Sequence, residues 1–341
     1  MSARPTIRPF EPADVSPAAE HLAARHREQR LAYPILPARF EDPEACAAVI
    51  RSTMSFADGF AAETNGRLAG FLFAIKNFPS PTSGSARFGP IRGSMMFAHG
   101  HAVAPGIEPY PVYNTLFATL AERYMADGVF DHIAHVPAGD PALDDAWSNL
   151  GFGRNAAVAV RTTELLTAVS SAEVRIAAPD DLDTVYRIAA SGNAFHARAP
   201  IFTPYLEPNT EAEVRASYRN ALADEGQALF LGYAEGAAAG LLWVEPPKGS
   251  PLFTPDDACY IGDTAVLPGA RHAGLGTAIL QRALAWARER GYRHATLHYV
   301  PANPVSSEFW RRNGFIPVMY HLRRRLDERI AWAQPPEDLV R

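Results

Sequence analysis

The feature that most constrains the fold of this 341-residue chain is an internal repeat. Residues 101–152 align without a gap on residues 264–315, which lie 163 positions further along. The patterns Ala-Val-x-Pro-Gly and Trp-x-x-x-Gly-Phe occur in both segments. Because glycine, proline and tryptophan set backbone turns and core contacts, the match indicates a repeated fold rather than a repeated chemistry. In the first copy the identical residues are Ala102, Val103, Pro105, Gly106, Gly128, His135, Pro141, Trp147, Gly151 and Phe152.

Two shorter echoes extend the repeat upstream. Residues 8–15 resemble residues 175–182, an offset of 167, and residues 66–70 resemble residues 236–240, an offset of 170. The blocks keep the same order in both halves, and the length suits about two domains. The sequence therefore predicts two copies of one domain, at residues 1–166 and 172–334, followed by a tail over residues 335–341.

Composition narrows the class of protein. Hydrophobic residues make up 48% and charged residues 20%, which is typical of globular domains. No apolar run is long enough for a membrane span, and the first residues lack the apolar segment of a secretory signal. A net charge of −5 argues against non-specific nucleic-acid binding, and two cysteines cannot form a disulfide framework. We expect a cytoplasmic monomer or homodimer that acts on a small molecule, with no nucleic-acid or membrane partner.

Periodicity predicts the secondary structure of the second copy. The order is β-α-β-β-β-α-β-α-β, which indicates an α/β fold with a mixed (α+β) sheet and helices on its faces. The expected strands are residues 174–177, 228–233, 238–244, 258–267, 295–300 and 316–324, and the expected helices are residues 179–190, 275–290 and 305–312.

A glycine-containing loop, residues 271–277, joins an expected strand to an expected helix. Glycine lets the backbone turn tightly and approach a ligand closely. The first amides of a helix have no partner within the helix, and the helix dipole adds partial positive charge. The loop therefore has the chemistry of a pyrophosphate site, although a glycine pair alone also suits a plain tight turn.

The residues around this loop resemble a known family. The pattern Val266-x-Pro268-x-x-Arg271-x-x-Gly274-x-Gly276 resembles the acetyl-CoA motif of the GNAT N-acetyltransferase superfamily. Asn303 and the Gly-Phe pair at 314–315 resemble the asparagine and the closing strand of that family. Through the repeat, the resemblance implies two tandem GNAT-type acyl-CoA N-acyltransferase domains. It also implies acetyl-CoA as acyl donor, without a metal.

The same resemblance implies roles for individual residues. The backbone of Val266, Leu267 and Pro268 is expected to lie along the pantetheine arm. An amide near Ala265 or Val266 is expected to polarise the thioester carbonyl, and Asn303 to bind the pantetheine or acetyl end. The amides expected to hold the pyrophosphate are those of Arg271, His272, Ala273, Gly274, Leu275, Gly276 and Thr277.

The first copy has lost this loop. Glu108, Pro111 and Tyr113 stand where the motif has its arginine and its two glycines. Proline has no amide proton to donate, tyrosine adds a ring, and glutamate adds negative charge. We expect this copy to be a degenerate GNAT-like domain, non-catalytic and kept for packing or for shaping the substrate site. Its two alternating histidines, His99 and His101, are by themselves weak evidence for a metal site.

Transfer to an amine needs a group that takes the proton from the ammonium. Asp263 lies well inside the strand before the loop and is the first candidate base, although it also suits a role in orienting a neighbour. His298 on the following strand is the second candidate. Its counterpart His135 lies in the degenerate copy, which favours a structural role.

The acid that protonates the leaving thiolate is a point of departure from the family. Where the family has a tyrosine before its closing Gly-Phe, this chain has Trp310, and an indole does not act as such an acid. Either another group such as Tyr299 donates, with Tyr260 and Tyr320 as further choices, or the thiolate leaves to water.

The acceptor is expected to bind at a loop after the first helix of the second copy, residues 191–205. The candidates there are His196, Arg198 and Tyr205. Arg198 suits an acceptor carboxylate or phosphate, or solvent exposure. The sequence thus predicts an acetyl-CoA-dependent N-acetyltransferase that moves an acetyl group directly to a small-molecule amine. The alternatives are a mycothiol-synthase-like acetyltransferase and a non-catalytic acyl-CoA-binding or regulatory protein.

Overall fold

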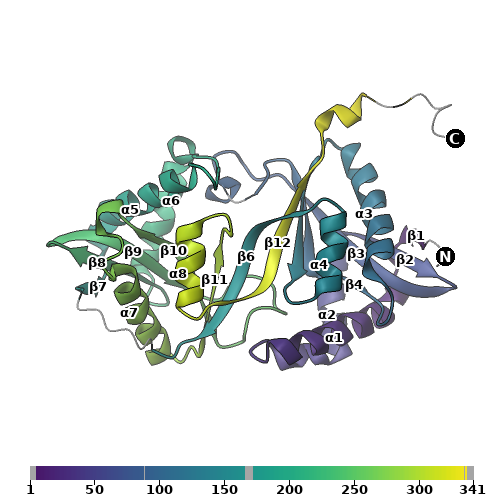
Figure 1. Ribbon diagram of the computed structural model, residues 1–341, viewed down its shortest axis with the longest axis horizontal. Helices are drawn as coiled ribbons and strands as arrows, with labels where there is room; N and C mark the ends of the chain where they lie inside the picture. The colour runs from purple at the N-terminus through teal and green to yellow at the C-terminus, as the bar shows by residue number, and fades with distance from the viewer. Residues whose placement is uncertain (1–4, 88, 166–171, 334, 336–341) are drawn as a thin grey trace. The chain divides into compact units, whose positions relative to one another are not determined.

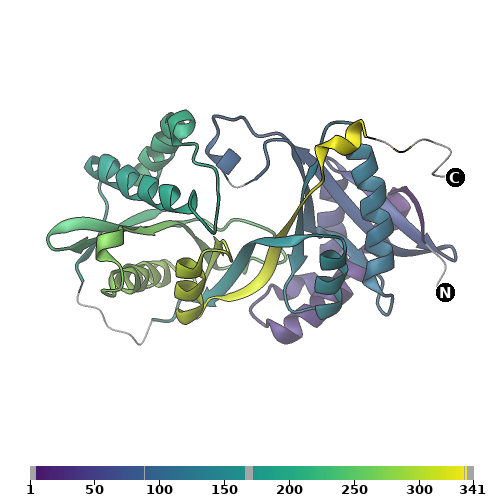
Figure 2. The same cartoon turned by 45° about the horizontal axis from the view of Figure 1, so that its top comes forward.

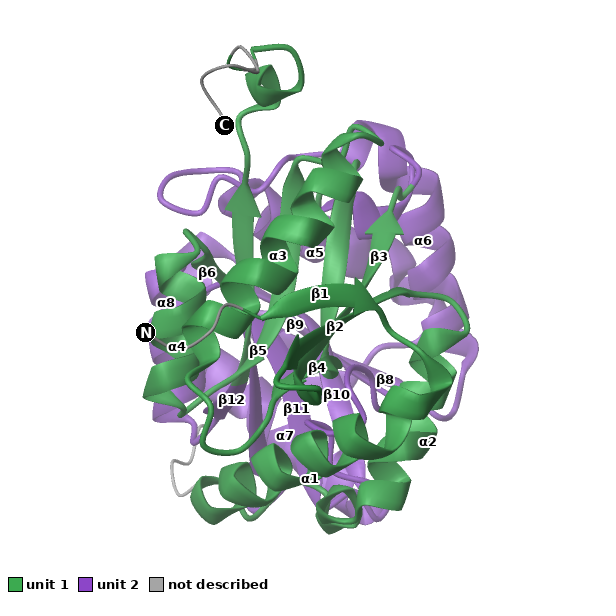
Figure 3. Ribbon diagram, turned by 90° about the vertical axis from the view of Figure 1, so that its right-hand side faces the viewer, with its two compact units in different colours: residues 1–79, 90–155, 319–341 green, residues 80–89, 156–318 purple. Residues whose placement is uncertain are grey.

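The computed structural model describes residues 5–87, 89–165, 172–333 and 335. The chain forms two compact units (Figure 3). Unit 1 comprises residues 1–79, 90–155 and 319–341, and unit 2 comprises residues 80–89 and 156–318. The expected join and almost all of the expected tail lie outside the described residues. No helix in the described ranges is long and apolar enough to cross a membrane.

Unit 1 is a mixed sheet with strand order β1-β2-β3-β4-β5-β12 and helices on both faces (Figure 1). Neighbours are antiparallel except β4 and β5, which are parallel. The strands are β1 (Thr6–Pro9), β2 (Asp58–Thr64), β3 (Arg67–Asn77), β4 (Gly93–Val103), β5 (Asp131–Pro137) and β12 (Ile316–Arg325). The helices are α1 (Val15–Ala32), α2 (Pro43–Met54), α3 (Pro109–Met125) and α4 (Pro141–Asn149).

Unit 2 has the same plan, with strand order β6-β11-β10-β9-β8-β7. Here β10 and β11 are the parallel pair. The strands are β6 (Gly153–Thr162), β7 (Val174–Ile176), β8 (Ala228–Ala234), β9 (Ala237–Glu245), β10 (Ala258–Val266) and β11 (His294–Tyr299). The helices are α5 (Leu182–His196), α6 (Glu207–Ala223), α7 (Leu275–Glu289) and α8 (Pro304–Arg312).

Side chains that alternate along the strands of unit 2 build two cores, one on each face of the sheet. Phe230 of β8 packs in the cluster that contains residues of α7 and α8. Its neighbours Leu229 and Leu231 pack in the cluster formed with α5 and α6 (Figure 2). This period of two is that of a strand buried on both faces.

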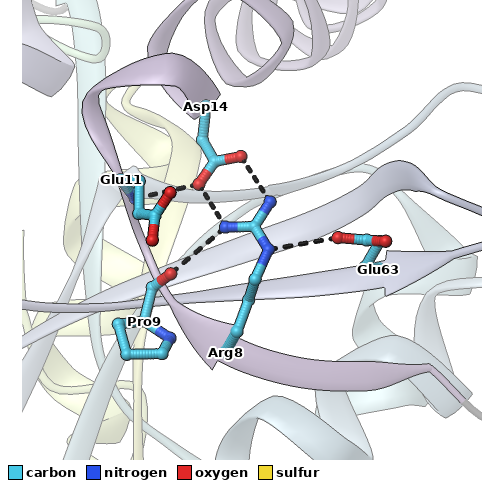
Figure 4. A network of polar contacts seen from close by, with 5 residues as sticks. All are labelled: Arg8, Pro9, Glu11, Asp14 and Glu63. Carbon is cyan, nitrogen blue, oxygen red and sulfur yellow. Dashed lines mark hydrogen bonds and ion pairs between the residues drawn. The ribbon is translucent and has the colours of Figure 1, made fainter.

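The repeat is visible in individual hydrogen bonds. Arg8 donates two hydrogen bonds of 2.7 Å to the Asp14 carboxylate, which also accepts from the Glu11 amide (Figure 4). Arg175 binds Asp181 in the same way, 167 positions later, at 2.7 and 2.8 Å. In both halves a bidentate pair ties the first strand to the start of the first helix. The similarity between residues 8–15 and 175–182 in the sequence therefore reflects a repeated structural feature.

The last strand of each copy pairs outside its own copy. In unit 1, β12 from the C-terminal copy is antiparallel to β5, from Met319 opposite Pro137 to Arg325 opposite Asp131. In unit 2, β6 from the N-terminal copy is antiparallel to β11, with Ala157 opposite Tyr299. The compact units therefore differ from the two sequential copies, because each takes its closing strand from the other copy.

The mixed α/β class expected from sequence is confirmed, and every element expected in the second copy is present. The prediction was wrong between residues 191 and 223. Helix α5 runs on to His196, and a whole helix, α6, follows at Glu207–Ala223. The residues of α6 are largely polar, and only a narrow face is buried: Glu207, Thr210, Val214, Tyr218 and Ala221.

Candidate active site

The parallel strands β10 and β11 separate partway along β10, and we call this place the β10–β11 fork. Their pairing ends at Ile261 opposite Leu297. Beyond it β10 stays paired with β9 as far as Val266, whereas β11 stays paired with β6 as far as Tyr299. The second half of β10 therefore has an edge that β11 does not cover.

The direction of the backbone groups on this edge follows from one hydrogen bond. The Leu267 amide donates to the Ala239 carbonyl of β9 at 2.8 Å. Because amides alternate in direction along a strand, those of Leu267 and Ala265 face β9, and that of Val266 faces the fork. Of the two expected donors to a thioester carbonyl, Val266 has the suitable direction.

The loop before α7 has the backbone of an anion site. Gly274 is left-handed (φ 79°), as is His272 (φ 65°), and the first backbone bond of α7 runs from the Ala278 amide to the Gly274 carbonyl at 3.0 Å. The amides of residues 275–277 therefore precede the first bond within the helix. A Cβ on Gly276 would lie 3.2 Å from the Phe309 ring, so a larger residue there would crowd this turn. The loop fits the pyrophosphate of an acyl-CoA.

Arg271 connects this loop to the fork. Its Nε donates to the Val266 carbonyl at 2.9 Å, and its guanidinium lies 4.6 Å from the centre of the Phe195 ring. The Val266 carbonyl thus faces the same side as its amide, in agreement with the alternation above. Phe195 stands at the end of α5, and no motif in the sequence predicts this contact.

A β-bulge carries the candidate base. From Ile261 to Thr264 strand β10 advances by three positions, whereas β9 advances by only two, from Val244 to Leu242. Asp263 lies within this bulge, and its carboxylate accepts a hydrogen bond from the Tyr218 hydroxyl of α6. Burial, followed by the charge of Asp263, raises the pKa of Tyr218 well above its ordinary value. Tyr218 is therefore a neutral donor that fixes the orientation of Asp263.

A second carboxylate lies against the bulge. The Glu245 side chain is only 7% exposed, and Lys248 is its ion-pair partner. A Cβ on Gly262 would overlap with Glu245 Oε1, so any larger residue there would have to displace the Glu245 carboxylate. Burial raises the pKa of Glu245 despite the partly opposing effect of Lys248. Sequence reasoning missed both Glu245 and Tyr218, because no motif links them to Asp263.

His298 is placed on the other arm of the fork. Its Nδ1 lies 3.0 Å from the Tyr260 hydroxyl, and burial lowers its pKa to about 4. Such a histidine is neutral and a weak base at neutral pH. Tyr299 ends β11 and packs beside the core that contains Trp310, which is 5% exposed.

Asn303 joins the acceptor side to the fork. Its Oδ1 caps α8 by accepting from the amides of Val305 and Ser306, at 3.1 and 3.2 Å. Its Nδ2 must therefore donate to His196 Nε2, which lies 3.1 Å away. Burial lowers the pKa of His196, in keeping with an unprotonated Nε2. Two residues expected to bind different substrates are thus in contact.

The other two expected acceptor residues lie further out. Arg198 is exposed, and Tyr205 is 46% exposed on the segment that leads to α6. Neither side chain is brought into the cluster of Asp263, Tyr218 and His196 by a described contact. Their role in acceptor binding stays a prediction.

The equivalent β4–β5 fork of unit 1 is filled by side chains. Its parallel pairing ends at Met96 opposite Ala134, and His101 then donates from Nε2 to the His135 carbonyl at 3.0 Å. The Nδ1 of His101 lies 2.8 Å from the hydroxyl of Tyr113, which stands where α7 has Gly276. Burial lowers the pKa of His101 to about 3, so it stays neutral. Both of its ring nitrogens are engaged.

Arg25 of α1 completes this filling. Its guanidinium donates to the carbonyls of His101 and Ala98, both at 2.6 Å. Shifted by the 167 residues that relate the first helices, Arg25 corresponds to Gly192 of α5. In unit 2 a Cβ on Gly192 would lie 3.1 Å from the Cβ of Ala265, so the helix passes β10 there with no side chain between them.

Comparison with known proteins agrees with this geometry. Residues 195–315 match the acetyltransferase (GNAT) family. A GCN5-related N-acetyltransferase from Sphaerobacter thermophilus has a similar structure, with 16% identity, a TM-score of 0.58, and coverage of 95% of this chain and 96% of that chain. A glucosamine N-acetyltransferase region of a fungal multi-domain β-N-acetylglucosaminidase superposes over 95% of this chain and 38% of that one, with 12% identity and a TM-score of 0.54. A search of curated protein sequences gives no significant match.

The GNAT acetyltransferase family model thus matches residues 195–315, and the likeness to solved structures shows the GNAT fold over both halves of the chain. Proteins of this family are acyltransferases that use acetyl-CoA. The matched segment contains the β10–β11 fork, the loop before α7 and Asn303.

Proposed function

We propose that this protein transfers an acetyl group from acetyl-CoA directly to the amino group of a small-molecule acceptor, and that only unit 2 performs the reaction. The observation that carries the proposal is Asp263, displaced by a bulge at the start of the β10–β11 fork and oriented by Tyr218. The bulge presents a carboxylate on the strand that leads to the anion-binding loop.

Acetyl-CoA supplies the activated acyl group, and the residues of the chain bind and orient it. The amides of residues 275–277 hold the pyrophosphate, and the Val266 amide polarises the thioester carbonyl. The Val266 carbonyl already accepts a hydrogen bond from Arg271. Of the two backbone groups of Val266 on this edge, the amide is therefore the one that would meet the thioester.

Asp263 takes the proton from the acceptor ammonium. One of its oxygens accepts from Tyr218, which leaves the other for the amine. A carboxylate beside a bound ammonium relieves the cost of forming the neutral amine. His298 is the weaker candidate, since its low pKa and its contact with Tyr260 favour a structural role.

The acid remains the point at which this chain departs from its family. Trp310 is buried in the core, and its indole N–H donates hydrogen bonds but does not act as an acid. Protonation of the thiolate by Tyr299 or by solvent is compatible with catalysis based on proximity and carbonyl polarisation, which by themselves lower the barrier by several kcal/mol.

The test is release of free thiol from acetyl-CoA in the presence of a panel of primary amines. We expect turnover with at least one amine, and a loss of about 100-fold in kcat for Asp263→Asn with unchanged coenzyme A binding. Tight binding without turnover by any amine would instead support the non-catalytic, acyl-CoA-binding alternative.

A further inference from the structure

A segment from the N-terminal half of the sequence belongs to the catalytic unit. Residues 80–87 follow β3 of unit 1 in the chain, yet they cluster with unit 2 and include a short 3-10 turn, Gly84–Arg87 (Figure 3). This turn packs against α6. That helix also carries Tyr218, the partner of Asp263.

The contact centres on a buried ion pair. Arg87 Nη1 lies 2.8 Å from Glu207 Oε1, and the two side chains are only 6% and 5% exposed. Glu207 is the first residue of α6. Separating a pair this deeply buried would leave each charge uncompensated away from water, so the two side chains are held together.

Further bonds continue along the same helix. The Gly84 amide and the Ser83 hydroxyl donate to Glu213 Oε1 at 3.1 and 3.3 Å. The turn thus grips α6 at its first residue and again near its middle. Tyr218, about one and a half turns beyond Glu213, then reaches Asp263.

The charge of Arg87 also reaches the acceptor side. The pKa of His196 is lowered first by burial and further by Arg87, against the opposing effect of Asp263. The charges of Asp263 and Arg87 thus both act on this ring, and Asn303, the N-cap of α8, donates to it.

We propose that residues 80–87 form a wall of the acceptor site, in which Arg87 is a positioning residue that holds α6 and its Tyr218 against Asp263. This inference rests on the proposed function. The degenerate copy then contributes to catalysis although its own fork is filled. Its contribution is the connection between β3 and β4, which contains residues 80–87 and completes the catalytic unit.

The test replaces the ion pair by apolar side chains of similar size, in the double variant Arg87→Met/Glu207→Leu. Such replacements preserve packing and avoid leaving one buried charge alone. We expect kcat/KM for the best amine of the panel to fall about tenfold, since small misplacements of catalytic groups are costly. Acetyl-CoA affinity should change less than about twofold, and the pKa of His196, followed by its ring-proton NMR signals, should rise.

Two comparisons separate positioning from general stability. Arg323→Met/Asp131→Leu removes an ion pair of unit 1 and should leave all three measurements unchanged. Arg87→Lys keeps the charge and should retain most of the activity. If the double variant does not fold, Glu207→Gln is the substitute test, because it removes one charge with little change of shape. It should also lower kcat/KM.

A folded double variant with wild-type transfer and wild-type His196 titration would overturn the proposal. If no amine is acetylated by the wild type, the proposed function fails, but the His196 titration still decides whether Arg87 lies beside the acceptor site. If the pKa of His196 is the same in the double variant as in the wild type, residues 80–87 do not form a wall beside His196. An increase in this pKa would support the wall.

Discussion

The N-termini of α3 and α7 occupy equivalent places in the repeat and have opposite chemistry. Helix α7 begins at Leu275 after a left-handed glycine, so its first amides face outward. Helix α3 begins at Pro109, the counterpart of His272, and therefore starts three positions earlier in the aligned copy. Pro109 and Pro111 have no amide proton, and Glu108 brings a negative charge to the N-cap. The same fold can thus keep or lose the free amides that an anion site requires, through the residue at which one helix starts.

The two forks differ in the same sense. In unit 1 Arg25, His101 and Tyr113 cover the backbone where the strands part. In unit 2 the counterpart of Arg25 is Gly192, and that of His101 is Thr264. A fork that binds a ligand must leave backbone groups without protein partners, whereas a fork that serves only packing satisfies them with side chains.

The largest effect is expected from Gly274→Pro. Proline cannot adopt φ 79° and removes an amide, so the loop before α7 must rearrange. The loss of two charge-assisted hydrogen bonds should weaken coenzyme A binding by about 1000-fold in calorimetric titration. Pro111→Gly in unit 1 is the matched control and should leave binding unchanged. If only Pro111→Gly changed the affinity, coenzyme A would bind to unit 1 and our assignment to unit 2 would be wrong.

Acidification should distinguish the filled fork. The pKa of His101 in the folded protein is about 3, below the ordinary value, so the unfolded state takes up the proton first. The stability from neutral His101 is complete above pH 6.5 and declines as the pH falls toward 3, with a loss on the order of 3 kcal/mol at pH 4. Denaturant titrations should show a weaker pH dependence between 6.5 and 4 for His101→Gln than for the wild type. Equal pH dependence of the wild type and the variant would show that burial does not keep His101 neutral.

Filling the open fork should imitate the degenerate copy. Gly192→Arg places the counterpart of Arg25 next to Ala265, where even a Cβ has a 3.1 Å contact. We expect coenzyme A binding to weaken about 30-fold, because the arginine competes for the exposed edge of β10. Gly153→Arg, where a side chain meets open space, controls for the added charge. Equal affinities for the two variants would mean that the fork is not the binding place.

The smallest change is expected from Tyr218→Phe. This substitution removes only the hydrogen bond to Asp263. A hydrogen bond to a charged group is worth about 1.5–3 kcal/mol, so kcat should fall about tenfold and its pH profile should shift, with coenzyme A affinity unchanged. Tyr233→Phe on β8 is the control. An unaltered pH profile would remove Tyr218 from the proton-transfer machinery.

Much of the local structure around the candidate site was predictable because its signals are local. The strand, loop and helix around Gly274 follow from glycine conformation and from hydrophobic period, and the losses at Pro111 and Tyr113 can be deduced from the alignment of the copies. Helix α6 could have been found from its narrow buried face, but its first residues are polar and lie close behind prolines. Tyr218 was therefore missed together with the helix.

The sequence by itself determined the repeat, the mixed fold and the half in which a glycine precedes the helix start, since each depends on residues close together in the chain. The tertiary structure alone decided the exchange of β6 and β12, the contact of Tyr218 with Asp263, and the arrival of Arg87 at Glu207. The closing strands have the same length and the same preceding Gly-Phe, so no local signal distinguishes their partners. Which strand or side chain meets which is a property of packing between segments far apart in the chain, which local propensity does not encode.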